Sequence, residues 1–238
     1  MEAMMPYPEI YTRVLFAAVL LFCTAAAAAS VPFYNTLWRK ELLSDSRPAK
    51  KAESPLFYIV CALFGLAVGT VLAFRDMTPA DAAAVFMIPA AVTVAVCDIL
   101  NGFVPVIGLV LVSLCAVARC VASCVAEGAL WPALTFVFGA VFGILLMLLI
   151  NFISKKTGAA ASDTGHTALV TVICASAGIV PGTAVLALAV TAALLSYILP
   201  VHLKNRKNGG TERLSEINYP LAPFLFVFYY AGVLAGLF

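Results

Sequence analysis

The sequence predicts an all-α, polytopic membrane protein, and composition and patterning both point to this fold class. Of the 238 residues, 63% are hydrophobic and only 11% are charged, and the mean hydropathy is +1.05. A soluble domain is roughly half apolar and a quarter charged. The apolar residues gather in eight runs, and most approach the ~20 residues that a helix needs to cross a bilayer. We therefore expect about eight transmembrane helices.

The eight expected helices follow directly from these runs. They cover 10–33, 55–74, 80–97, 103–125, 130–153, 165–181, 183–201 and 219–238. The sixth and seventh runs are short, and the Pro181-Gly182 pair between them predicts a tight hairpin. Two Gly-x-x-x-Gly patterns predict close helix packing, Gly65 with Gly69 and Gly139 with Gly143.

The connections between the runs are too short to form a second domain. The longest polar stretch, 34–54, cannot bury a core of its own. We therefore expect a single integral-membrane domain over 1–238. Its loops on one face are expected at about 34–54, 98–102, 154–164 and 202–218.

The basic residues predict the orientation of the chain. Eleven of the 14 Lys and Arg residues lie in the loops 34–54, 154–164 and 202–218. Loops rich in Lys and Arg favour the cytoplasmic side. Both termini are therefore expected on the outer side of the cell membrane, opposite the cytoplasm. Anionic lipid headgroups are the expected partners of these loops. Arg119, toward the outer end of its run, is expected to reach the interface with its charged end.

The seven cysteines do not predict a metal site. None of them forms a Cys-x-x-Cys pair, whereas zinc sites use closely spaced thiolates. Buried cysteines behave as small apolar residues. We expect neither a metal nor another cofactor, and no nucleic-acid partner.

Two aspartates differ from the other acidic residues, which lie in the N-terminal tail or in loops. Asp98 directly follows the third apolar run, and Asp163 precedes the sixth. The expected topology places both at the cytoplasmic face at similar depth. Two carboxylates that converge in a partly dry site share one proton. Such a pair can activate water at one member and support the carbonyl oxygen of a peptide with the other.

Each aspartate also has a structural interpretation, which the residues alone leave open. Asp98 can end a helix with support from Asn101, and Asp163 can be the N-cap of the next helix. A proton- or cation-coupled transporter is a further interpretation of the same acidic pair, since ionisable residues in membrane helices mark ion pathways.

Three stretches resemble the type IV prepilin peptidases, membrane aspartyl proteases with a Gly-x-Gly-Asp motif. "CDILNGFVPVIGL" is similar to the element around the first aspartate, and "AASDTGHTALVTVICASAGIVPG" to the element around the second. "NYPLAPFLFVFYYAG" resembles the closing helix of the family. Its "PLAP" is also similar to an element of the presenilin-type proteases, whose first motif the residues around Asp98 do not match.

The resemblance implies a peptidase that removes the short leader of prepilins or pseudopilins at the cytoplasmic face. Asp98 and Asp163 are then the catalytic pair. Ala160 and Ser162 stand where the family has its two glycines. The first loop lacks the cysteine pairs of many bacterial members, which implies a compact, peptidase-only form.

Four polar residues near the two aspartates are candidates for supporting roles. His166 lies one helical turn after Asp163, where it can tune an acid. Asn101, Ser162 and Thr164 can hydrogen-bond an aspartate. A catalytically inactive relative that binds pilin-like helices is, beside the transporter, an alternative to the peptidase.

Overall fold

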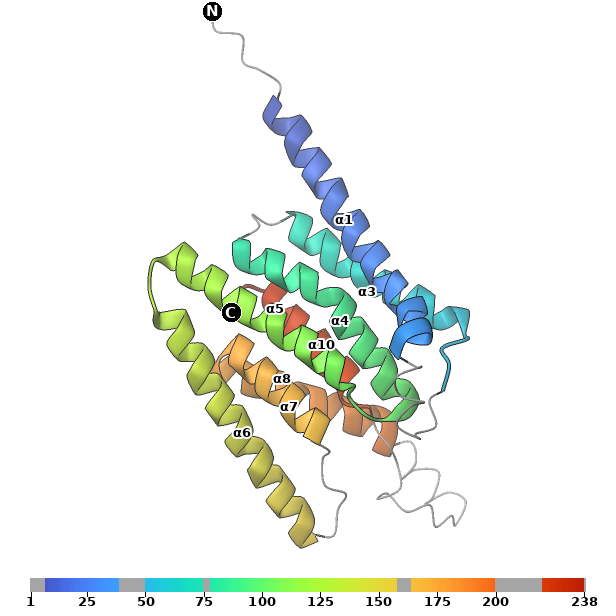
Figure 1. Ribbon diagram of the computed structural model, residues 1–238, viewed down its shortest axis with the longest axis vertical. Helices are drawn as coiled ribbons and strands as arrows, with labels where there is room; N and C mark the ends of the chain where they lie inside the picture. The colour runs from blue at the N-terminus through green and yellow to red at the C-terminus, as the bar shows by residue number, and fades with distance from the viewer. Residues whose placement is uncertain (1–6, 39–49, 75–77, 158–163, 200–219, 238) are drawn as a thin grey trace, which may run out of the picture.

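A computed structural model describes residues 7–38, 50–74, 78–157, 164–199 and 220–237, and these residues form a helical bundle without a strand (Figure 1). Helices α1 and α8 each continue into a short π-helical turn. The helices are α1 (Tyr7–Phe33) with η1 (Tyr34–Trp38), α3 (Pro55–Phe74), α4 (Pro79–Asn101), α5 (Val106–Glu127), α6 (Trp131–Thr157), α7 (Thr164–Ala177), α8 (Ile179–Ala193) with η2 (Leu194–Ile198), and α10 (Ala222–Leu234).

Six of these helices are long and apolar enough to cross a membrane. The exceptions are α7 and α10, which are apolar but have only 14 and 13 residues. At 1.5 Å per residue they measure about 20 Å, whereas the hydrocarbon core of a bilayer is about 30 Å thick. The chain is thus a helical membrane protein by the length and composition of its described helices.

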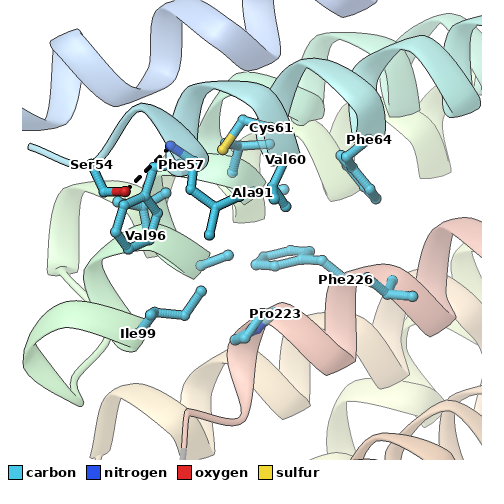
Figure 2. A pocket seen from close by; sticks show the side chains of 14 residues that line it. Ser54, Phe57, Val60, Cys61, Phe64, Ala91, Val96, Ile99, Pro223 and Phe226 are labelled. Atoms are coloured by element: carbon cyan, nitrogen blue, oxygen red, sulfur yellow. Dashed lines mark hydrogen bonds between the residues drawn. The ribbon is translucent and has the colours of Figure 1, made fainter. Parts of the chain in front are cut away.

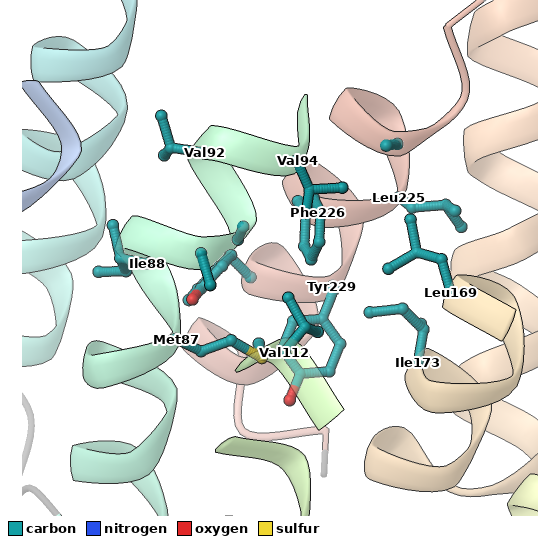
Figure 3. Packing of buried hydrophobic residues seen from close by; sticks show 14 of the residues in the cluster. Met87, Ile88, Val92, Val94, Val112, Leu169, Ile173, Leu225, Phe226 and Tyr229 are labelled. Atoms are coloured by element: carbon teal, nitrogen blue, oxygen red, sulfur yellow. The ribbon is translucent and has the colours of Figure 1, made fainter. Parts of the chain in front are cut away.

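The centre of the bundle is formed by α4, α7 and α10. In Figure 1, α10 lies in the middle of the bundle, where it contacts α4, α7 and α8. The core close-up shows Met87 and Ile88 of α4, Leu169 of α7 and Phe226 of α10 gathered in one cluster (Figure 3). A helix that is apolar on all sides belongs inside a bundle, and the sequence of α10 has this character.

The glycine pairs allow close helix contacts, as the sequence predicts. A Cβ on Gly69 would lie 3.0 Å from the Cβ of Cys23, so α3 packs tightly on α1. A Cβ on Gly143 would lie 2.8 Å from the Cα of Thr171, so α6 packs tightly on α7. Small residues let helix backbones approach within a membrane, and both predicted patterns are confirmed.

The break between α7 and α8 lies earlier than the sequence predicts. The chain turns at Gly178, which has a φ of 84° that residues with a Cβ rarely adopt. Pro181 is instead in the first turn of α8, where a missing N–H costs nothing. The hairpin predicted at Pro181-Gly182 is therefore wrong by three residues.

The third predicted helix ends later than expected. Instead of ending at residue 97, α4 continues through Asp98 to Asn101 and is terminated by Gly102, whose φ is 72°. The predicted loop 98–102 is therefore mostly the last helical turn, and the connection to α5 begins at Gly102. This difference places Asp98 on a rigid helix rather than in a loop.

Candidate active site

Asp98 is almost completely enclosed by protein. It lies in the last turn of α4, and only 1% of its surface is exposed. Because an isolated carboxylate is costly to bury, its two oxygen atoms need polar partners. Both oxygens have one, and the partners come from the beginnings of two other helices.

The first partner is the backbone of α10. The N–H of Ala222 donates to Oδ2 of Asp98 at 2.7 Å. Ala222 is the first residue of α10, and its N-cap residue, Leu221, has no side chain that can cap the helix. The first N–H groups of a helix lack partners within the helix and carry partial positive charge. Asp98 thus caps α10 from a different helix.

The second partner is His166 at the beginning of α7. Its Nε2 lies 3.0 Å from Oδ1 of Asp98, and the His166 side chain is only 11% exposed. At this distance one proton bridges the two atoms, with either the imidazole or the carboxyl group as donor. The pair is therefore a buried place where a proton can be held or exchanged.

These contacts bring together three helix ends that are far apart in the sequence. The C-terminal end of α4 meets the N-terminal ends of α7 and α10 at one carboxylate. Two positive helix ends and an imidazole surround the negative group, which offsets part of the cost of its burial. An acid held this rigidly in the apolar interior is a candidate for proton-transfer chemistry.

Asn101 fixes the end of α4 from the other side. Its Nδ2 donates to the hydroxyl of Tyr34 at 2.7 Å, and its Oδ1 accepts from the N–H of Lys50 at 2.9 Å. The Tyr34 hydroxyl in turn donates to the carbonyl of Lys50 at 2.7 Å. Asn101 therefore joins α4 to η1 and to the segment before α3, and these bonds do not include Asp98.

A second pair of hydrogen bonds holds the same segment. Asn35 accepts from the N–H of Ala52 and donates to its carbonyl, both at 2.9 Å. The short stretch that leads into α3 is thus anchored to η1 and to the end of α4. The sequence singles out Asn101, but neither its partner Tyr34 nor Asn35, which binds Ala52, because no local pattern relates residues so far apart.

The remaining site candidates are only partly described. Thr164 is the first residue of α7 and is exposed. Ser162 and Asp163, together with Ala160, lie outside the described residues. Asp98 and His166 are therefore the members of the predicted site whose contact the structure describes. Within the described part of the chain, no three His, Cys, Asp or Glu side chains gather as metal ligands.

A separate polar cluster is formed by Arg119 of α5, Ser176 of α7 and Tyr229 of α10. Arg119 donates from Nη1 to the hydroxyl of Tyr229 at 2.9 Å, and Ser176 lies 2.6 Å from the same hydroxyl. Arg119 is only 7% exposed. The expectation that it reaches the interface is therefore wrong, because Tyr229 on the neighbouring α10 gives the guanidinium a partner inside the bundle. A cavity of about 570 Å³ adjoins Arg119 and Ser176.

Comparison of the chain with models of known families, with curated proteins and with solved structures gave no match. Its function is therefore inferred from its own residues and their geometry.

Proposed function

We propose that the protein is a membrane aspartyl endopeptidase with Asp98 and Asp163 as its catalytic pair. Its substrates are prepilins or pseudopilins, from which it removes a short leader at the cytoplasmic face. The observation that carries the proposal is the burial of Asp98 against the beginning of α7, through its 3.0 Å contact with His166. This is the end of α7 that Asp163 directly precedes in the sequence.

Chain connectivity supports the pairing. Asp163 lies three residues before His166, and consecutive Cα atoms are 3.8 Å apart, so their Cα atoms are separated by at most roughly 11 Å. Since His166 contacts Asp98 directly, a second carboxylate is tethered near the first. Chain order and the observed contact thus support the part of the proposal that pairs the two aspartates.

The proposed reaction is water-mediated peptide hydrolysis. The ionised aspartate takes a proton from water as the hydroxide oxygen bonds to the peptide carbonyl carbon. The protonated aspartate gives its proton to the carbonyl oxygen, which forms a tetrahedral diol. When the C–N bond breaks, the amine leaves with the proton that was taken from water, and one hydroxyl of the diol returns a proton to the other aspartate, which restores the singly protonated pair. His166 acts by holding Asp98 in place and by offering an alternative site for the shared proton.

The proposed placement in the membrane has eight crossings, with the Asp98 end of the bundle in contact with the cytoplasm. The concentration of Lys and Arg in 34–54, 154–164 and 202–218 supports this orientation. The short helices α7 and α10 both begin beside Asp98. In this placement they are two of the eight crossings, and they pack against the longer helices of the bundle. Anionic headgroups are the proposed partners of the basic loops.

Cleavage of a prepilin with a short basic leader tests the proposal. The purified protein is incubated with this substrate in liposomes, and mass spectrometry reads loss of the leader. Asp98→Asn and Asp163→Asn are both expected to abolish cleavage. Asp81→Asn is the matched control, because Asp81 is also on α4, is only 4% exposed and caps the opposite end of that helix.

The outcomes separate the alternatives. Cleavage that survives in either Asp98→Asn or Asp163→Asn contradicts the two-aspartate mechanism. A wild-type protein that binds prepilins without cleaving them is an inactive relative. If it neither binds nor cleaves but moves protons or cations across the liposome membrane, the acidic pair serves transport.

A further inference from the structure

An apolar groove lies beside Asp98 on the outside of the bundle. It runs between α3, α4 and α10 and encloses about 290 Å³ (Figure 2). Its lining is apolar apart from Ser54, which lies at the end where α3 begins. Figure 2 shows Val60 and Phe64 of α3 on one side, with Ile99 of α4 and Pro223 of α10 opposite.

The groove exists because α3 packs mainly on α1 and meets α4 and α10 over few residues. The α4 side carries residues 91, 92, 95, 96 and 99, a spacing that places them on one helix face. Two of these residues, Ala91 and Ala95, have small side chains that leave space above the helix. Phe226 of α10, only 2% exposed, forms another part of the wall.

One end of the groove is lined by residues that adjoin Asp98 and its backbone partner in the chain, while the carboxylate itself is enclosed behind this wall. Ile99 directly follows Asp98, and Pro223 directly follows Ala222, whose N–H donates to Asp98 at 2.7 Å. From Ile99 the groove extends along α4 to Ala91, which is roughly 12 Å at 1.5 Å per residue. An occupant of the groove therefore has one end beside Asp98 and extends from there toward the middle of α4.

We propose that this groove seats one face of an apolar helix in the peptide substrate, next to the bond that is cleaved. The inference rests on the proposed function and specifies how its substrate is held. A helix about 10 Å wide takes up roughly 400 Å³ per turn, which is more than the whole groove provides. Side chains from one face of the helix therefore enter the groove, while the helix backbone remains at its rim.

The length and the rim of the groove define the substrate. About 12 Å corresponds to roughly two helical turns, so two or three large apolar side chains at i, i+3 or i+4, and i+7 fit along it. The rim residues Leu56, Val60 and Val227 are 62%, 56% and 49% exposed and offer apolar surface to the rest of the helix. The substrate thus has its polar leader at the Asp98 end and its apolar segment along the groove.

The end of the groove at Ser54, where α3 begins, is held in a fixed position before substrate binds. Ser54 closely follows the segment that Asn101 and Asn35 bind through Lys50 and Ala52. Because these bonds also involve the end of α4, the beginning of α3 is fixed relative to Asp98. Such preorganisation lowers the entropic cost of positioning a substrate.

Site-specific photo-crosslinking tests where the substrate lies. Benzoylphenylalanine replaces Val60 in the groove, or Leu145 on α6 as a control of similar exposure, 56% against 60%. The probe is a peptide with a short basic leader and a 20-residue apolar helix, in phosphatidylcholine–phosphatidylglycerol vesicles. We expect at least tenfold more crosslinked peptide from position 60 than from position 145.

A variant that fills the groove tests its role in cleavage. Ala95→Phe places a ring over the α4 wall, and Ala67→Phe places one at an exposed position of α3 outside the groove. We expect Ala95→Phe to raise KM for the same peptide at least tenfold with little change in kcat, and Ala67→Phe to leave both unchanged. The first large apolar residues of the peptide helix are Leu, and replacing them with Ala is expected to raise KM for the wild type in the same way.

The results separate the groove from the protease. Suppose that the peptide is cleaved but crosslinks equally at positions 60 and 145, or that position 60 crosslinks to lipid alone. Either result overturns the proposed binding of substrate in the groove and leaves the proposed protease activity standing. Crosslinking confined to position 60 without any cleavage supports the groove and overturns the protease. If Ala95→Phe fails to fold, the crosslinking ratio and the Leu-to-Ala peptides decide. If the peptide is not cleaved and does not crosslink selectively at position 60, both proposals are overturned.

Discussion

Nε2 of His166 lies 3.0 Å from Oδ1 of Asp98, although the two residues are 68 positions apart in the chain. The contact joins the beginning of α7 to the end of α4. Oδ2 of the same carboxylate accepts from the N–H of Ala222 at the beginning of α10. Asp98 thus has a structural role that is separable from the proposed catalytic one.

Removing the Asp98 carboxylate is expected to destabilise the bundle. Asp98→Ala leaves the buried N–H of Ala222 and the His166 ring without this partner, which costs about 1–3 kcal/mol of unfolding free energy. Asp98→Asn retains an oxygen for the N–H and offers an amide to the imidazole, so its loss is expected to be below about 1 kcal/mol. Reversible unfolding in mixed micelles measures both. Equal stability of Asp98→Ala and wild type would show that the two contacts contribute nothing.

His166 is expected to affect cleavage through Asp98 rather than through substrate binding. His166→Phe removes one partner of the carboxylate and is expected to lower kcat about 10–100-fold, with KM unchanged. His166→Gln keeps a side-chain donor and is expected to restore part of kcat. A kcat of His166→Phe equal to that of the wild type would exclude His166 from this positioning role.

Tyr34 is expected to control the segment before α3. Tyr34→Phe removes the hydroxyl that accepts from Asn101 and donates to the carbonyl of Lys50. Because Oδ1 of the same Asn101 holds the N–H of Lys50, that N–H should exchange with solvent faster. Hydrogen–deuterium exchange measures this change. The N–H of Ala52, which Asn35 holds independently, is the internal control and should exchange as in wild type. Equal acceleration at both positions would indicate general loosening instead.

The Arg119 cluster is expected to stabilise the fold without contributing to cleavage. Tyr229→Phe removes the hydroxyl that binds Arg119 and Ser176, and a hydrogen bond to a charged group is worth about 1.5–3 kcal/mol. We expect a loss of that size in unfolding experiments, with kcat and KM for the leader peptide unchanged. A large effect on kcat at unchanged stability would connect this cluster to the site around Asp98.

Local sequence patterns predict the helices well where the pattern itself determines the structure. The apolar run 55–74 coincides with α3, and the predicted glycine contacts of α3 and α6 are present. The breaks are less accurate. Pro181 suggested a hairpin but is tolerated inside the first turn of α8, and α4 continues past Asp98 because Gly102, not the aspartate, terminates it.

By itself, the sequence determined that this chain is a helical membrane protein and that Asp98 lies at the end of an apolar run. Apolar content and run length act within one segment, so they are readable without a fold. Only the tertiary structure decided which groups meet that carboxylate, since Ala222 is 124 positions away and contributes a backbone N–H that no residue pattern marks. The groove near the end of α4 likewise depends on how α3 packs against α1. A space between three helices is set by their mutual packing and cannot be read from the sequence of any one of them.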